Sequence, residues 1–134
     1  GDAKALMLSG VTKSINRVRS FSNSIGQALP AGLEPSQVTY LATLGAFFDT
    51  AADQQDVILK EYYKSLWGNG LEAYNLYRRT GSPKMMQPTR SINGGDFVYT
   101  MVYPANFVNL NGSVDQKPDN STRVFWDVNG FVLR

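Results

Sequence analysis

The side chains of this chain that could do chemistry are carboxylates, hydroxyls, amides and basic groups, because the chain contains neither cysteine nor histidine. Without cysteine there are no disulfides, thiolate nucleophiles or cysteine-based metal sites. Without histidine the commonest general base is missing, and zinc lacks one of its usual ligands. The composition therefore predicts no metal site and no cofactor.

Two pairs of aspartates have a spacing that could serve acid–base catalysis. Asp53 and Asp56 form one pair, and Asp115 and Asp119 form the other. A carboxylic acid acts as a general acid near neutral pH only when an apolar setting raises its pKa, and both pairs lie in polar turn sequences. We interpret all four as solvated turn residues and predict that the chain is not an enzyme.

Three residues are candidates for ligand binding, and no other ligand-binding residue is assigned. Arg78 and Arg79 could bind an anionic ligand, and Trp126 could stack on a sugar ring. The structural interpretation is favoured for the arginines: they cap helix carbonyls and pair with the following tail. For Trp126 two roles are about equally favoured: stacking on a sugar ring, or filling a groove of the protein. Trp67, on a wide apolar helix face, is predicted to be core.

The helix that carries the two arginines is defined by both of its ends. Asn69 is a good N-cap, and Glu72 three residues later completes a capping box. Gly81 can take the left-handed conformation that ends a helix, and Pro83 prevents the helix from resuming. The sequence therefore predicts a helix over 69–80.

Three more helices are predicted before it. An apolar stripe at helical spacing runs through 3–28, and the Pro- and Gly-rich stretch 29–35 predicts a loop. A second stripe ends near Asp49, and a turn around Asp53 leads into a third helix that Gly68 ends. These helices predict α–α hairpins joined by short loops.

Gly10 interrupts the first helical pattern. A glycine inside a helix costs about 1 kcal/mol relative to alanine. Two interpretations stay open, a tolerated weakness or a close approach between two helices.

After the last predicted helix the chain becomes rich in Gly, Asn, Pro, Ser and Thr. Residues 96–103 favour a short strand, 109–123 a long polar loop, and 124–126 a second extended segment. We expect this tail to pack over the helices through aromatic anchors, which are Phe97, Tyr103, Phe107, Phe125 and Trp126.

The fold class that these patterns predict is mainly α. Helical hairpins occupy about 2–81, and an irregular tail with one or two short strands occupies about 82–134. The net charge of +2, with acids and bases intermixed, leaves no footprint for nucleic acid and no basic cluster for an anionic membrane. No apolar run approaches the ~20 residues of a membrane span.

Residues 66–83 read Leu-Trp-Gly-Asn-Gly-Leu-Glu-Ala-Tyr-x-x-Tyr-Arg-Arg-Thr-Gly-x-Pro. This stretch resembles the late region of the SusD/RagB family of nutrient-binding outer-membrane lipoproteins of Bacteroidetes. The Tyr-Pro-Ala-Asn stretch in 103–111 and Val-Phe-Trp-Asp at 124–127 agree in order and spacing. The Gly-Val-x-x-Ser-Ile stretch at 10–15 looks like a helix of the same family, so the resemblance covers most of 3–127.

The resemblance implies a tetratricopeptide-like helical scaffold and a binding protein rather than an enzyme. It implies a surface-exposed outer-membrane lipoprotein that captures oligosaccharide or peptide. The expected partner is a SusC-like TonB-dependent transporter, to which the protein hands its nutrient as a lid subunit. Family members contain on the order of 500 residues. Residues 1–134 are therefore expected to be the C-terminal segment, attached to the membrane only through an N-terminal lipid anchor upstream.

The alternative is a free-standing helical domain whose groove binds a protein partner. A neighbouring gene for a TonB-dependent porin would favour the first interpretation, and its absence the second. A hydrolase is a third class, disfavoured because no acid–base pair has an apolar setting.

Overall fold

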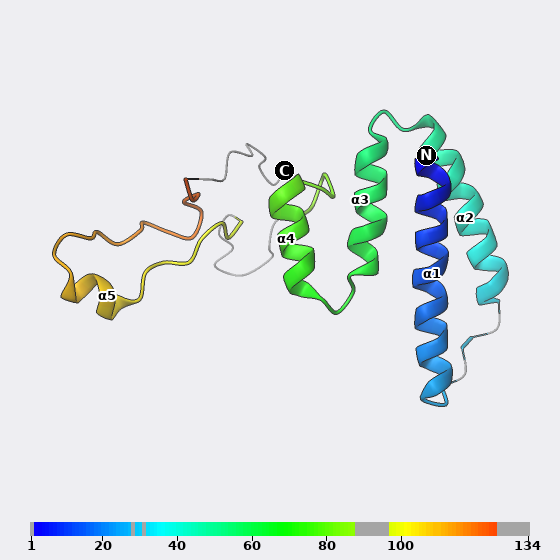
Figure 1. Ribbon diagram of the computed structural model, residues 1–134, viewed down its shortest axis with the longest axis horizontal. Helices are drawn as coiled ribbons and strands as arrows, with labels where there is room; N and C mark the ends of the chain where they lie inside the picture. The colour runs from blue at the N-terminus through cyan, green and yellow to red at the C-terminus, as the bar shows by residue number, and fades with distance from the viewer. Residues whose placement is uncertain (1, 28, 31, 88–96, 126–134) are drawn as a thin grey trace. The chain divides into compact units, whose positions relative to one another are not determined.

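The computed structural model describes residues 2–27, 29–30, 32–87 and 97–125. The chain divides into two compact units, Gly1–Tyr74 and Asn75–Arg134, which are taken separately below. The described residues contain helices and no strand, which confirms a mainly α protein. The helices are α1 (Ala3–Ser24), α2 (Leu33–Thr50), α3 (Gln54–Ser65), α4 (Gly70–Thr80) and α5 (Ala105–Leu110) (Figure 1).

The first unit is built around α1, which contacts both α2 and α3. The three helices run in alternating directions, as the hairpin prediction requires (Figure 1). Apolar side chains at helical spacing meet in one core, and burying a large one contributes roughly 1.5–3 kcal/mol. The buried members of this core are Met7, Leu44, Phe48 and Val57, with Leu8, Val11, Ala51 and Ile58 partly buried around them.

A glycine of α2 lies against side chains of α1. A Cβ atom added at Gly45 would lie 3.2 Å from Cε of Lys4, whose Nζ donates to Asp49 Oδ2 at 2.5 Å. At Gly10 an added Cβ would meet nothing within 4 Å. Gly45 therefore lies in a contact between two helices of this unit, and Gly10 does not.

Side-chain caps begin two of these helices. Asp2 Oδ1 accepts from the N–H of Ala5 at 3.2 Å, and Asp53 Oδ1 accepts from the N–H of Asp56 at 3.0 Å. Each cap satisfies a backbone donor that has no partner within the helix. The first helix ends at Ser24, four residues before the predicted boundary.

The prediction that Trp67 belongs to the core is wrong, because its side chain is 97% exposed. Helix α3 ends at Ser65, and Gly68 has a φ of +87° just beyond it. Trp67 therefore lies beyond the end of the helix, although the apolar pattern of the helix continues through it. The turn exposes its side chain to solvent.

The α4 helix confirms the predicted start and stop. Asn69 Oδ1 accepts from the N–H of Glu72 at 3.3 Å, which is the predicted cap. The N–H of Asn69 donates to the carbonyl of Leu66 at 2.7 Å, in place of the reciprocal bond of a capping box. Gly81 has a φ of +68°, and its N–H donates to the carbonyl of Tyr77 at 2.8 Å. The helix therefore ends in the left-handed conformation.

An aromatic cluster forms the core of the second unit. The ring centroids of Tyr77 and Phe97 are 5.0 Å apart, as are those of Phe97 and Tyr99. The guanidinium of Arg123 lies 4.8 Å from the Tyr99 ring. Phe97 is therefore an anchor as expected, whereas Phe125 is exposed rather than buried.

The strand expected over 96–103 does not form in its described part, 97–103. Three backbone N–H groups within 99–102 donate to Asn120, two to its carbonyl at 2.9 and 3.1 Å and one to its Oδ1 at 3.2 Å. The side chain of Gln116 exchanges two hydrogen bonds with the backbone of Tyr103, at 2.9 and 2.8 Å. Side-chain amides and a single carbonyl thus replace the regular ladder of a strand pair. Trp126, in the second expected segment, lies outside the described residues.

The short helix α5 was not expected in the tail. Pro104 precedes it, and its carbonyl accepts from the N–H of Phe107 at 2.9 Å. The rings of Tyr103 and Phe107 pack with centroids 5.7 Å apart. Six helical residues are too few to show an apolar periodicity, so the sequence pattern could not distinguish this helix from a loop.

The two ends of α4 predict matched losses of stability. Asn69→Ala should lower the free energy of unfolding by ~1 kcal/mol through loss of the cap. Gly81→Ala should cost a similar ~1 kcal/mol, since a Cβ strains the left-handed conformation. Urea denaturation measures both, with Gly112→Ala as the control, because an added Cβ there meets nothing within 4 Å. A loss no larger for Gly81→Ala than for Gly112→Ala would contradict the assignment.

Candidate functional site

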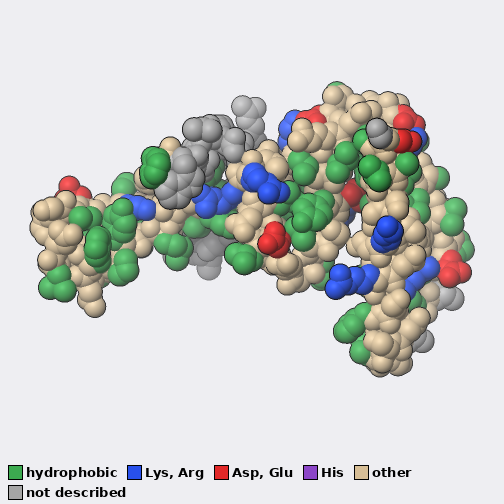
Figure 2. Space-filling view, in the orientation of Figure 1, with side chains coloured by type: hydrophobic (Ala, Val, Ile, Leu, Met, Phe, Trp, Pro, Cys, Tyr) green, Lys and Arg blue, Asp and Glu red, His purple; other side chains and the backbone are tan. Residues whose placement is uncertain are grey.

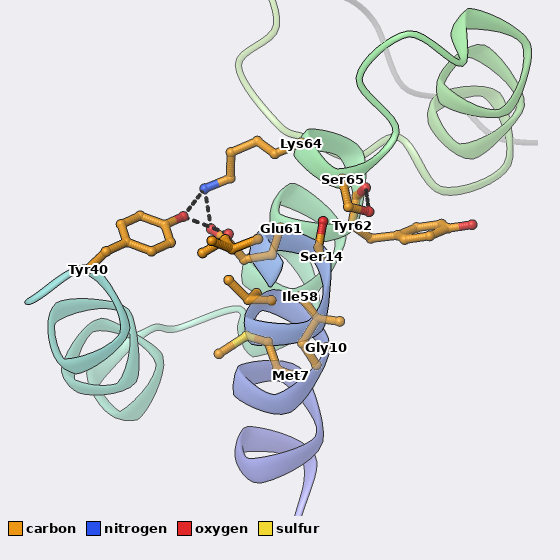
Figure 3. A pocket seen from close by; sticks show the side chains of 11 residues that line it. Met7, Gly10, Ser14, Tyr40, Ile58, Glu61, Tyr62, Lys64 and Ser65 are labelled. Carbon is orange, nitrogen blue, oxygen red and sulfur yellow. Dashed lines mark hydrogen bonds and ion pairs between the residues drawn. The ribbon is translucent and has the colours of Figure 1, made fainter. Parts of the chain in front are cut away.

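A cleft of about 370 Å³ opens among α1, α2 and α3 of the first unit (Figure 3). Its volume falls within the roughly 300–1,000 Å³ of small-molecule sites. The cleft lies between the end of α3 and the first two thirds of α1. The lining residues are Met7, Gly10, Val11, Ser14, Ile15, Tyr40, Ile58, Glu61, Tyr62, Lys64 and Ser65.

The walls of the cleft are mainly apolar. Val11 and Ile15 come from the apolar stripe of α1, and Ile58 comes from the facing stripe of α3. Gly10 adds no side chain, so this part of the wall stays open (Figure 3). The Ser65 hydroxyl donates to the carbonyl of Tyr62 at 2.7 Å.

One edge of the cleft is polar and is built from two helices. Tyr40 of α2 donates its hydroxyl proton to Glu61 Oε2 at 2.6 Å. Lys64 Nζ donates to the Tyr40 hydroxyl oxygen at 2.5 Å and also pairs with Glu61 Oε1. Glu61 and Lys64 are three residues apart, which places them on one face of α3. The Glu61 side chain is only 9% exposed, so its two partners replace the water it loses.

The protonation states of this edge follow from burial and hydrogen bonding. Burial raises the pKa of Tyr40, and the hydrogen bond to Glu61 raises it further. Burial lowers the pKa of Lys64, but its hydrogen bonds to Glu61 and Tyr40 outweigh burial and leave that pKa raised. At neutral pH the tyrosine is therefore neutral and the lysine is charged. Neither the neutral phenol nor the charged ammonium is a base or a nucleophile.

The first aspartate pair serves local structure. Asp53 caps α3, and the partly buried pair of Asp56 with Lys60 has a distance of 3.0 Å. Asp56 is buried, so the prediction that it is a solvated turn residue is wrong; Lys60 one turn later offsets the cost of burying its charge.

The second pair lies in the tail. Asp119 Oδ1 accepts from both the hydroxyl and the N–H of Ser121, and these hydrogen bonds lower the Asp119 pKa. Among the described residues no group of three or more His, Cys, Asp or Glu side chains is placed to hold a metal ion.

The candidates from sequence do not contribute to the cleft within the described residues. Arg78 is half-buried and Arg79 is exposed in the last turn of α4, and both are engaged by other groups of the protein. Trp126 lies outside the described residues.

Sequence reasoning missed Tyr40, Glu61 and Lys64. The spacing of Glu61 and Lys64 was a signal for an ion pair on one helix face. Nothing in the sequence indicated that Tyr40, 21 residues before Glu61, would join them.

Residues 10–104 match the model of the SusD-like family, which is described as starch-binding and associating with the outer membrane. This match covers well over half of the chain. The chain belongs to the SusD-like family. No curated protein and no solved structure is significantly similar to it.

The resemblance of residues 66–83 to this family is thereby confirmed. The matched region of the SusD-like chain contains α2, α3 and α4 whole, most of α1, and the polar edge of the cleft. It ends at Pro104, before α5 begins. None of the described helices is long and apolar enough to cross a membrane.

The raised pKa values at the polar edge predict a loss of stability at alkaline pH. The folded state holds the protons of Tyr40 and Lys64 more tightly than the unfolded state does. Their contribution is therefore complete below the ordinary values of 10.0 and 10.5 and is lost as pH rises through the raised values. Urea denaturation from pH 7 to 11 should show a shallower alkaline fall for Tyr40→Phe/Lys64→Met than for the wild type. Identical alkaline slopes would contradict the assigned shifts.

Proposed function

We propose that the SusD-like chain is the C-terminal segment of a cell-surface lipoprotein that binds glycans and works with a TonB-dependent transporter. The observation that carries the proposal is the match of residues 10–104 to a starch-binding family that associates with the outer membrane. Glycan capture and delivery to a transporter is the finer function that the resemblance of residues 66–83 implies.

The chemistry of the cleft supports binding rather than catalysis. Its polar edge consists of a neutral phenol, a charged ammonium and a carboxylate that both of them engage. Such an edge offers fixed donors and acceptors for hydroxyl groups, and its carboxylate already accepts from two donors. A helical scaffold with a preformed cleft is consistent with a receptor.

The expected partners follow from the resemblance. Oligosaccharide is the first expected ligand and peptide the second, with a SusC-like TonB-dependent transporter as the receiving protein. Attachment to the outer membrane would come from a lipidated cysteine upstream of these residues, with the protein exposed on the cell surface.

One observation favours a second candidate function, a helical domain that binds a protein. Large apolar side chains along α1 are exposed, among them Val18 and Phe21. Exposed apolar surface of this kind marks interaction sites.

The proposal predicts two results for the full-length protein that contains residues 1–134. Calorimetry with maltoheptaose should give a dissociation constant below about 1 mM, which corresponds to about −4 kcal/mol. Affinity purification from solubilised outer membranes should recover a TonB-dependent transporter with it. Residues 1–134 alone should bind maltoheptaose weakly or not at all, because the polar groups at the edge of the cleft, Tyr40, Glu61 and Lys64, already bind one another.

As a matched control, the full-length protein is titrated with an uncharged tetrapeptide. This titration separates glycan binding from peptide binding. Absence of both oligosaccharide binding and a co-purified transporter would contradict the proposal. Full-strength glycan binding by residues 1–134 would instead move the binding site into this segment.

A further inference from the structure

The apolar stripe of α1 is longer than the helix that covers it. Helix α1 has 22 residues and α3 has 12. The ribbon of α1 extends beyond the end of α3 (Figure 1), and Ser65, the last residue of α3, lines the cleft. The upper part of the stripe is packed, with Met7 buried in the core. Below the end of α3 the stripe is uncovered: Val18 and Phe21 are each 64% exposed and Ile25 is 54% exposed.

The uncovered stripe continues into a concave surface. Ser14 and Ile15 line the cleft, and Val18 follows them at spacings of four and three residues on the same face of α1. Gly10, at the upper end, leaves open space where a side chain would stand. We call this surface, the α1 side of the cleft (residues 10–15) together with the exposed stripe of Val18, Phe21 and Ile25, the α1 groove. The spacing of its apolar side chains matches the ridge of another helix.

The α1 groove is flanked by unpaired positive charge. Helix α1 contains four basic residues and no acidic residue. Lys4 and Arg19 are each paired with a carboxylate of α2. Lys13 and Arg17 are exposed and have no partner within the described part of the chain. In Figure 2, Lys and Arg side chains gather over α1, and hydrophobic side chains stand near its C-terminal end.

We propose that the α1 groove docks an acidic amphipathic helix of a protein partner. Apolar anchors of that helix, at spacings of three and four residues, cover Val18, Phe21 and Ile25. Acidic residues beside the anchors face Lys13 and Arg17, which fixes the orientation of the helix by charge complementarity. This docking does not depend on glycan binding by the SusD-like protein.

Other occupants fit the same surface less well. A second copy packed about a two-fold axis would bring the Lys13 and Arg17 side chains of both copies toward one another. A bilayer surface is flat and would leave the cleft at the upper end unfilled. A glycan has no apolar anchors at helical spacing for the exposed stripe.

Fluorescence anisotropy with three labelled 18-residue synthetic peptides tests the proposal on the folded chain. The first peptide is an amphipathic helix with leucine anchors and flanking glutamates. The second has lysines in place of the glutamates, and the third has serines in place of the leucines. The acidic peptide should bind at least about tenfold more tightly than either of the others, a difference of about 1.4 kcal/mol.

Variants of the chain locate the binding. Arg17→Glu should weaken the acidic peptide at least about fivefold and strengthen the lysine peptide, because it reverses a flanking charge. Phe21→Ser should weaken the acidic peptide by a similar factor. Val38→Ser is the matched control, since Val38 is 69% exposed on α2 and does not line the cleft. Circular dichroism of each variant shows that the helices are retained.

Five results would overturn the proposal. The acidic peptide does not bind. The acidic and lysine peptides bind equally well. Val38→Ser weakens binding as much as Phe21→Ser does. The chain binds phosphatidylglycerol–phosphatidylcholine vesicles through Phe21 and ignores the peptides, which makes the groove a lipid surface. Light scattering shows a dimer that Phe21→Ser dissociates, which makes the occupant a second copy.

Discussion

The packing of α1 against both α2 and α3 is the interaction on which the rest of the first unit depends. Met7 of α1 joins Leu44 and Phe48 of α2 and Val57 of α3 in one core. Because α3 is shorter than α1, the same packing leaves a cleft at the end of α3 and an uncovered stripe beyond it. Core, cleft and groove are thus three consequences of one helix covered along part of its length.

The polar edge of the cleft shows how a buried carboxylate is tolerated in an apolar setting. Glu61 loses most of its water, and the Tyr40 hydroxyl and the Lys64 ammonium replace it. Such a cluster costs free energy unless every member has a hydrogen-bonding partner. Its main effect is therefore to fix how α2 and α3 meet, and not to stabilise the unit.

Local signals made α4 predictable from sequence, because Asn69 and Gly81 act through the backbone within a few residues. Trp67 was misplaced because an apolar stripe does not show where its helix stops. The tail was misjudged because its backbone donors pair with Asn120 about 20 residues away, and propensity carries no information about such a partner. The polar edge of the cleft was missed for the same reason, because it joins side chains of two different helices that only tertiary packing brings together.

Hydrogen–deuterium exchange along α1 tests most directly whether this helix is covered over only part of its length. Amide protection reports local opening, which is easier where few apolar contacts must break. The account predicts that amides of 6–15 exchange at least about tenfold more slowly than those of 17–24 in the same helix, a difference of about 1.4 kcal/mol in opening free energy. Uniform protection from Leu6 to Ser24 would contradict it.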